Sequence, residues 1–370
     1  MPLQGWATPE GTNRYRERLT ESADEKHFRT QQNLSLSSIG LGTYLGQWDE
    51  ETDRAYTSSV VRAVELGVNV IDTAANYRFQ RSERSIGAAL RELSEANKAA
   101  RDELLICTKG GYLPFDSQPP RDVRRYFEET FVKTGVASFS DIVAGSHCMT
   151  PRYLENQIRQ SLGNLDLETL DVYYVHNPET QLQEVSEEEF DERLARAFEM
   201  FEEMRAADKI RMYGAATWNG FRAAPDAGGY LSLERMAGVA RAVGGDTHGF
   251  RFVQLPFNLA MPEALVSENQ TLNNERVSLL EAAEALGITV VASASILQGK
   301  VARNLPEEVR EPLGALSTDA QTAIQFVRST PGITTALVGM SRISHVEENL
   351  QLARIAPAKT EDYQRLFERQ

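Results

Sequence analysis

The sequence predicts a single-domain (β/α)8 barrel of the TIM type. Short apolar runs alternate with segments that have helical periodicity, and eight such pairs can be counted along residues 33–357. No G-x-G-x-x-G motif follows any of these runs, which disfavours a doubly wound fold. No stretch rich in Pro, Gly or Ser divides the chain, and a barrel can reach 370 residues as one domain. These observations favour one closed parallel sheet surrounded by helices.

Each strand is expected where a short apolar run ends on a polar or charged residue. The expected strands are GLGTY (40–44), NVIDT (69–73), LLICTK (104–109), DVYYVH (171–176), MYGAAT (212–217), FVQLPFN (252–258), ITVVASA (288–294) and TALVGM (335–340). A helical pattern follows each one, with Ser82, Pro151 and Ser344 expected at helix starts and Pro256 expected to end its strand. The expected helices are 52–66, 83–93, 151–163, 187–207, 231–243, 274–286, 318–329 and 345–353.

The barrel is expected to carry additions at both ends. Residues 1–32 are polar and mixed in charge, which predicts an N-terminal extension that packs on the surface or is partly disordered. NLSLSSI (33–39) alternates apolar and polar residues and predicts a small hairpin. A polar helix near 359–369 is expected in a C-terminal tail, residues 358–370.

A long insertion interrupts the alternation after the third strand. Residues 110–149 separate Lys109 from the next helix, whereas βα loops usually have about 2–6 residues. The segment DVRRYFEETFVKTG (122–135) is expected to hold a helical piece. Because the insertion begins at the C-terminal end of a strand, it is expected to form one wall of the substrate pocket. The alternative is a packed decoration that only adds core.

The composition narrows the class of protein. Apolar residues make up 41% and charged residues 25% of the chain, as in ordinary soluble proteins, and the formal net charge is −14. This acidic balance argues against nucleic acid as a partner, although a local basic pocket for a phosphorylated cofactor is allowed. Only two cysteines occur, Cys107 and Cys148, which favours a reducing, cytoplasmic compartment. No apolar stretch approaches about 20 residues and no secretory signal core is present, so no membrane association is expected.

Ionisable side chains end three successive expected strands. Asp72, Lys109 and His176 lie at these ends, and Tyr77 follows Asp72 by five residues. The C-terminal strand ends of a parallel barrel share one face, so these groups are expected to form one site. The alternative for each residue is a local hydrogen bond without a catalytic role.

The four residue types suit proton donation to a carbonyl oxygen. A phenol has a pKa near 10 and donates sluggishly, but a nearby ammonium is expected to lower that pKa. A buried carboxylate keeps the ammonium charged, and an imidazole can hold the substrate oxygen. The hydride must come from a cofactor, because no side chain supplies one.

At these positions the sequence resembles the aldo-keto reductase superfamily, over roughly residues 33–355. The resemblance is carried by VNVIDTAANY, SERSIGAAL, ICTKGG, DVYYVHNPE and KIRMYGAATW. It implies a (β/α)8 barrel that binds NADPH, less often NADH, and reduces a small or medium carbonyl or oxidises an alcohol. It further implies that Tyr77 is the general acid, that Lys109 and Asp72 tune it, and that His176 orients the carbonyl.

The cofactor segments depart in part from the family pattern. Ala216 and Thr217 stand where a Ser-Asn pair usually holds the nicotinamide amide, and Ser293 stands at a usual aromatic position. Looser nicotinamide packing is therefore expected. GMSRISHVEEN (339–349) resembles the segment that binds the adenosine 2′-phosphate and adenine. The expected cofactor residues are Gly42, Thr43, Asp72, Thr217, Gln254, Ser295, Leu297, Gly339, Ser341, Arg342, Glu348 and Asn349, and the expected substrate residues are Tyr44, Trp48 and Trp218.

Two other functions remain open at this point. A resident cofactor with the same site would support epimerisation or isomerisation of a sugar-like alcohol. A barrel kept as a non-catalytic binding subunit is the other alternative, against which the complete set of four residues argues. His27, His147, His248 and His345 have no metal-ligand spacing and are interpreted as structural or surface residues, so no metal is expected.

Overall fold

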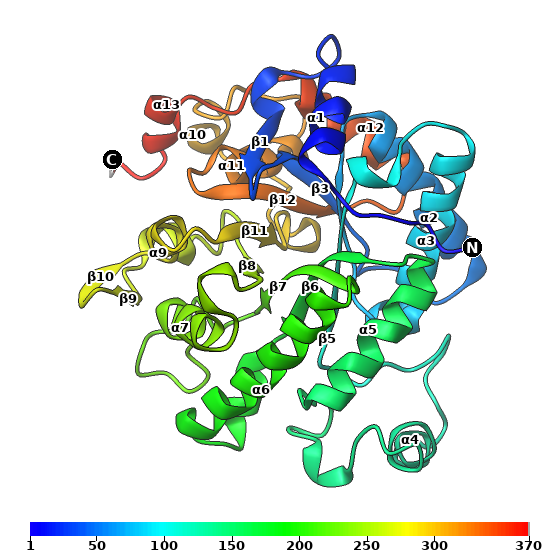
Figure 1. The fold of residues 1–370 in the computed structure, drawn as a ribbon. Coiled ribbons are helices and arrows are strands. Elements are labelled where there is room, and N and C mark those ends of the chain that lie inside the picture. The colour runs from blue at the N-terminus through cyan, green and yellow to red at the C-terminus, as the bar shows by residue number, and fades with distance from the viewer. Residues whose placement is uncertain (369–370) are drawn as a thin grey trace.

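The computed structural model describes residues 1–368 and contains a closed barrel of eight parallel strands (Figure 1). The predicted (β/α)8 fold is therefore confirmed. Around the barrel the strands follow one another in chain order, and β8 and β11 complete the circle. The barrel strands are β3 (Ile39–Gly42), β4 (Val70–Asp72), β5 (Leu105–Gly110), β6 (Leu170–His176), β7 (Ile210–Ala216), β8 (Phe250–Pro256), β11 (Thr289–Ser293) and β12 (Ile333–Gly339).

After each barrel strand a helix packs on the outside of the sheet (Figure 1). These helices are α2 (Glu50–Glu65), α3 (Arg81–Glu95), α5 (Pro151–Leu165), α6 (Glu187–Ala206), α7 (Leu233–Gly244), α9 (Leu279–Ala285), α11 (Asp319–Ser329) and α12 (Ile343–Asn349). Several begin at side-chain caps of the expected kind, such as Asp49 before α2 and Ser186 before α6. Their inward faces and the outward faces of the strands form the main core.

Side chains from the barrel strands fill the barrel interior. Val70, Val172 and Tyr174 belong to this inner cluster, which also contains Leu34 and Leu36 of β2. The strand β2 (Leu34–Ser37) pairs with β1 (Phe28–Gln31) in an antiparallel hairpin. This hairpin seals the barrel end opposite the predicted site.

A hairpin is present as predicted, but the prediction that it lies within residues 33–39 is wrong. Only its second strand lies there, and the first strand comes from the segment assigned to the extension. The extension also holds α1 (Pro9–Arg18), where the hydroxyl of buried Tyr15 donates hydrogen bonds to the carbonyls of Val64 and Val68. Of the two possibilities left open for residues 1–32, packing on the barrel is the one observed.

The insertion has a core of its own beside α5. It contains α4 (Val123–Phe127), which continues into one π-helical turn, Glu128–Val132. The predicted helical piece is therefore present. Phe127 and Phe131 are buried together with Cys148 of the insertion and Tyr153 of α5. Figure 1 shows α4 away from the barrel strands.

Three boundary predictions are wrong because of contacts or turns that the patterns do not reveal. Residues 274–277 belong to a second hairpin, β9 (Gln270–Leu272) and β10 (Glu275–Val277), which turns through Asn273 and Asn274 in left-handed conformations. Ser82 does not cap α3, because its hydroxyl donates to the Thr43 carbonyl at 2.8 Å. Ser344 lies inside α12, whose N-cap is Arg342.

Pro256 ends β8 as expected. The remaining helices are short. They are α8 (Glu263–Val266), α10 (Glu307–Arg310) and α13 (Thr360–Gln364). The tail helix expected at 359–369 is thus shorter than predicted, and residue 369 lies outside the described residues. Within residues 1–368 no helix combines the length and apolarity needed to cross a membrane.

Candidate active site

A buried ion pair lies at the C-terminal end of the barrel. Asp72 is the last residue of β4, and Lys109 is the penultimate residue of the neighbouring strand β5. The Lys109 ammonium donates to Asp72 Oδ2 at 2.5 Å and to the Thr73 carbonyl at 2.8 Å. Gln254 of β8 donates through Nε2 to the second oxygen, Asp72 Oδ1, at 2.7 Å. The carboxylate is thus bonded from both sides.

The ion pair keeps Lys109 charged. Burial opposes the positive charge, but the Asp72 carboxylate raises the pKa of Lys109 above its ordinary value. The side chains of Lys109 and Asp72 are only 1% and 5% exposed, so solvent screens their attraction little. The site therefore contains a fixed ammonium in a dry surrounding.

Tyr77 lies above this ammonium. It begins a short 3-10 turn, Tyr77–Gln80, directly after the strand end, and Lys109 Nζ is 4.9 Å from the centroid of its ring. The Tyr77 ring also packs edge-on against His176, with 5.8 Å between ring centroids. Burial raises the pKa of Tyr77, and Lys109 offsets only part of this rise. The expectation that the ammonium would lower the pKa below its ordinary value is therefore wrong, because desolvation is the larger effect.

The turn after Tyr77 has an unusual backbone. Arg78, Phe79 and Gln80 have φ values of 49°, 58° and 69°, in the left-handed region that non-glycine residues rarely adopt. The buried Arg78 guanidinium holds the turn by donating to the Gln47 carbonyl at 2.7 Å and to Asp53 Oδ1 at 2.6 Å. Such strain persists only where surrounding contacts over-determine it, and it is typical of functional sites.

His176 ends β6 on the other side of Tyr77. Burial, with a smaller contribution from Lys109, holds its pKa well below the ordinary value. The imidazole is therefore neutral at physiological pH. Its Nδ1 atom is buried and has no hydrogen-bond partner among the described residues. Tyr112 of the insertion packs edge-on against the His176 ring, with 5.2 Å between centroids.

The structure thus brings Asp72, Tyr77, Lys109 and His176 together, as the strand-end argument predicts. Three further polar residues lie at neighbouring strand ends. Thr217 follows β7, and its buried hydroxyl has no partner within residues 1–368. Gln254 donates one amide hydrogen to Asp72, which leaves its second amide hydrogen and its carbonyl oxygen for other partners. The Thr43 hydroxyl instead bonds Thr73 Oγ1 at 2.9 Å and links β3 to β4.

The other expected cofactor residues lie at the ends of β3, β11 and β12. Gly42 and Gly339 are paired at the last positions of their strands. After β11, the Ser295 hydroxyl is buried and donates to the Ala292 carbonyl at 3.3 Å, and Leu297 begins a short 3-10 turn. The Ser295 hydroxyl hydrogen is therefore used within the turn that follows β11.

The segment after β12 combines an exposed arginine with a buried amide. Ser341 is half-buried, and Arg342 is exposed and forms no ion pair with the described residues. Glu348 Oε1 accepts a hydrogen bond from Thr318 Oγ1 at 2.9 Å. Asn349 is buried, and its Oδ1 atom has no partner in the described part of the chain.

Three aromatic side chains expected to contact substrate are exposed. Tyr44, Trp48 and Trp218 are 59%, 49% and 44% accessible, respectively, which leaves their rings available to a ligand. Tyr44 packs edge-on against Tyr77 with 5.0 Å between centroids, so it borders the site directly. Trp48 packs against Phe79 in the strained turn, at 5.2 Å.

Sequence reasoning missed three residues next to His176. His147 is fully buried, and its Nε2 atom contacts the His176 carbonyl at 2.8 Å. Tyr112 packs edge-on against both of these rings. Glu179 Oε1 accepts backbone hydrogen bonds from residues 218, 219 and 220, which fixes the loop after Thr217. The only available signal was the HNPE sequence directly after β6, because His147 and Tyr112 lie in the insertion.

The closed parallel barrel defines the chain as a (β/α)8 protein whose polar residues gather at the C-terminal strand ends. Residues 38–368 match the model of the Aldo/keto reductase family. Since the match covers most of the chain, the protein belongs to this family.

Curated relatives match part of the chain in sequence, and solved structures share its fold, both at low sequence identity. The NADH-specific methylglyoxal reductase of Escherichia coli (strain K12) is 26% identical over 189 residues, which are 50% of this chain and 49% of that protein. The chain spans about half the length of the curated relatives it matches first. An aldo/keto reductase from Klebsiella pneumoniae in complex with NADP and acetate has a TM-score of 0.60 at 18% identity, covering 93% of this chain and 94% of the other. Aldo-keto reductase AKR11C1 from Bacillus halodurans has a TM-score of 0.62 at 20% identity, covering 92% and 95%.

Proposed function

We propose that this protein is an NADP(H)-dependent oxidoreductase that interconverts a small or medium carbonyl compound and the corresponding alcohol. The observation that supports this most strongly is the Lys109–Asp72 ion pair beneath the Tyr77 ring. A fixed, desolvated ammonium beside a phenol stabilises the phenolate that forms when the phenol gives up its proton. Family membership supports oxidoreductase chemistry.

Tyr77 is the proposed general acid. Its raised pKa keeps the phenol protonated before reaction, so a proton is available for the carbonyl oxygen of the substrate. Lys109 then stabilises the negative charge left on the Tyr77 oxygen, and Asp72 keeps Lys109 in place. The neutral imidazole of His176 is proposed to orient the carbonyl oxygen. A bound nicotinamide cofactor supplies or accepts the hydride.

The cofactor site is supported by buried polar atoms that lack partners. Thr217 Oγ1 and Asn349 Oδ1 are such atoms in residues 1–368, and the family resemblance assigns them to the nicotinamide amide and the adenine. Arg342 is proposed to hold the 2′-phosphate of NADP(H), since an arginine can donate two parallel hydrogen bonds to phosphate. The NADP complex of the K. pneumoniae protein supports this choice, whereas the E. coli relative is NADH-specific.

A direct test follows cofactor oxidation by absorbance with a panel of aldehydes and ketones. Tyr77→Phe should lower kcat by at least ~100-fold, the range for loss of a general acid, with the Kd for NADPH little changed. Tyr363→Phe is a matched control, because this hydroxyl bonds Thr330 far from the site. No NADPH oxidation with any carbonyl would contradict the proposed function, and wild-type turnover by Tyr77→Phe would contradict the assignment of the acid.

A further inference from the structure

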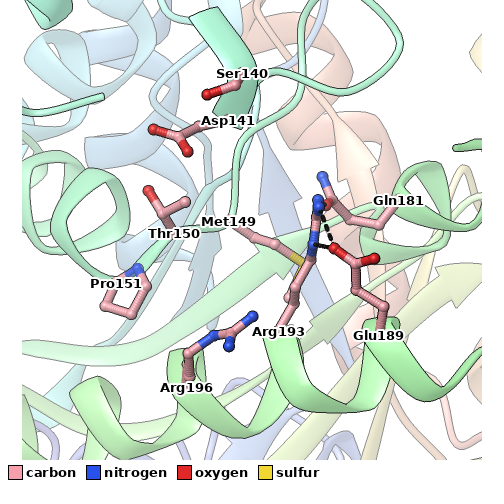
Figure 2. A pocket seen from close by; sticks show the side chains of 9 residues that line it. All are labelled: Ser140, Asp141, Met149, Thr150, Pro151, Gln181, Glu189, Arg193 and Arg196. Atoms are coloured by element: carbon pink, nitrogen blue, oxygen red, sulfur yellow. Dashed lines mark hydrogen bonds and ion pairs between the residues drawn. The ribbon is translucent and has the colours of Figure 1, made fainter. Parts of the chain in front are cut away.

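A chain of hydrogen bonds runs from the outer surface of the barrel to His176. It begins at Arg193 on α6, which lines the pocket drawn in Figure 2 together with Gln181. Arg193 Nη1 donates to Gln181 Oε1 at 2.6 Å. Gln181 Nε2 contacts His147 Nδ1 at 2.8 Å, and His147 Nε2 contacts the His176 carbonyl at 2.8 Å. Gln181 and His147 are both fully buried.

Along this series of hydrogen bonds, each residue determines which atom of the next residue donates and which accepts. An arginine can only donate, so the Gln181 atom that faces Arg193 must be the carbonyl oxygen. The amide NH2 of Gln181 then faces His147 and can only donate, so His147 Nδ1 must be unprotonated. The single proton of the neutral His147 ring therefore lies on Nε2 and is donated to the His176 carbonyl. Burial supports the neutral state by lowering the pKa of His147 to about 4.

The insertion also constrains the His176 ring. Tyr112 packs edge-on against both imidazoles, with 5.2 Å between centroids in each pair. Gly111 lies in the narrow space between the histidines, where an added Cβ would be 2.8 Å from His147 Nε2 and 3.1 Å from the His176 carbonyl oxygen. Beyond His176 the chain leaves β6 through Asn177, whose φ is 47°. Contacts from the insertion therefore act where the regular strand ends.

We propose that His147 is a positioning residue for His176, with Gln181 and Arg193 setting its tautomer. The expected effect on turnover rests on the proposed carbonyl chemistry, whereas the assignment of the His147 tautomer does not. The donated hydrogen bond fixes the end of β6 and thereby the direction in which the His176 imidazole meets the substrate oxygen. In this way the insertion contributes to catalysis through the strand end.

The tautomer is measured directly in protein labelled with 15N-histidine. The chain has five histidines, which single substitutions assign. His147 should show a protonated Nε2 and an unprotonated Nδ1. In Arg193→Met, Gln181 loses the donor that orients its amide, so the His147 signals should shift or split. Arg196→Met is the matched control, because Arg196 lines the same pocket one turn away on α6 and does not bond Gln181.

Kinetics then separate positioning from a purely structural role. His147→Leu removes the donor and should lower kcat/KM for a carbonyl substrate on the order of 10- to 100-fold, as expected for a misplaced group. The Kd for NADPH should stay unchanged. His147→Gln retains a donor near the position of Nε2 and should restore most of the lost activity.

The outcomes for this proposal and for the proposed function are distinguishable. A protonated Nδ1 on His147 in the wild-type protein overturns the tautomer assignment whether or not the protein reduces carbonyls. Wild-type kcat/KM in His147→Leu overturns the positioning role. If His147→Leu does not fold, Arg193→Met leaves the core intact, and unchanged 15N signals and kcat/KM in that variant overturn the proposal. Absence of activity in the wild-type protein contradicts the proposed function alone.

Discussion

Removal of the ammonium from the buried ion pair should destabilise the whole barrel. In Lys109→Met, the Asp72 carboxylate keeps only the neutral Gln254 amide as a side-chain partner, at 2.7 Å. Breaking a buried pair by removing one partner costs about 3–5 kcal/mol of unfolding free energy, and the exposures of 1% and 5% place this pair in that class. The double variant Asp72→Asn/Lys109→Met contains no buried charge. It should therefore be more stable than Lys109→Met, although it carries one more substitution.

The pH dependence of the unfolding free energy provides a second test of this prediction. Burial already raises the pKa of Asp72 in the presence of Lys109, and loss of the ammonium should raise it further above its value in the unfolded chain. The folded state then binds more protons, so Lys109→Met should lose stability as pH rises from about 4 through the raised pKa of Asp72. The double variant lacks this titration and should show a flatter profile.

The assay is urea unfolding followed by circular dichroism at pH 5 and pH 8. The expected order of midpoints at pH 8 is wild type, then the double variant, then Lys109→Met, and the gap between the last two should narrow at pH 5. A double variant no more stable than Lys109→Met would refute the reasoning, because the damage would then come from lost packing. A loss below about 1 kcal/mol in Lys109→Met would refute it as well, since such a value is typical of exposed pairs.

Three further predictions concern the cofactor, the insertion and acid stability. Arg342→Ala should weaken NADPH binding by about 1.5–3 kcal/mol, the value of a hydrogen bond to a charged group, and leave NADH nearly unaffected; equal losses in a fluorescence titration would contradict the phosphate role. Replacing residues 116–141 with a short glycine-rich linker keeps Tyr112 and His147 and should change kcat/KM unevenly across a substrate panel with NADPH affinity intact, whereas an unchanged profile would mean that the segment only adds core. Burial lowers the pKa of His27 to about 3, so its contribution to stability is present above pH 6.5 and lost as pH falls, by roughly 3 kcal/mol at pH 4. Urea midpoints of the wild type and His27→Gln should therefore converge on acidification, and parallel pH profiles would argue against this role.

Local patterns in the sequence determined the barrel and the position of its four central polar residues. Apolar runs and helical periodicity depend on neighbours within a few positions, so they are readable without the fold. Asp72, Lys109 and His176 could be grouped because the parallel topology alone places all C-terminal strand ends on one face. Tyr77 followed from its spacing to Asp72.

Tertiary structure decided the contacts between distant segments. Gln254 and Asp72 are separated by 182 positions in the sequence, so their hydrogen bond can be identified only in the folded barrel. The net rise in the pKa of Tyr77 depends on how much water the folded site excludes, which no local pattern reports. His147 lies in an insertion without regular periodicity, and only the folded chain brings its ring against the carbonyl of His176. A sequence specifies local conformation through short-range preferences, whereas the partners of buried polar groups are set by the packing of the complete fold.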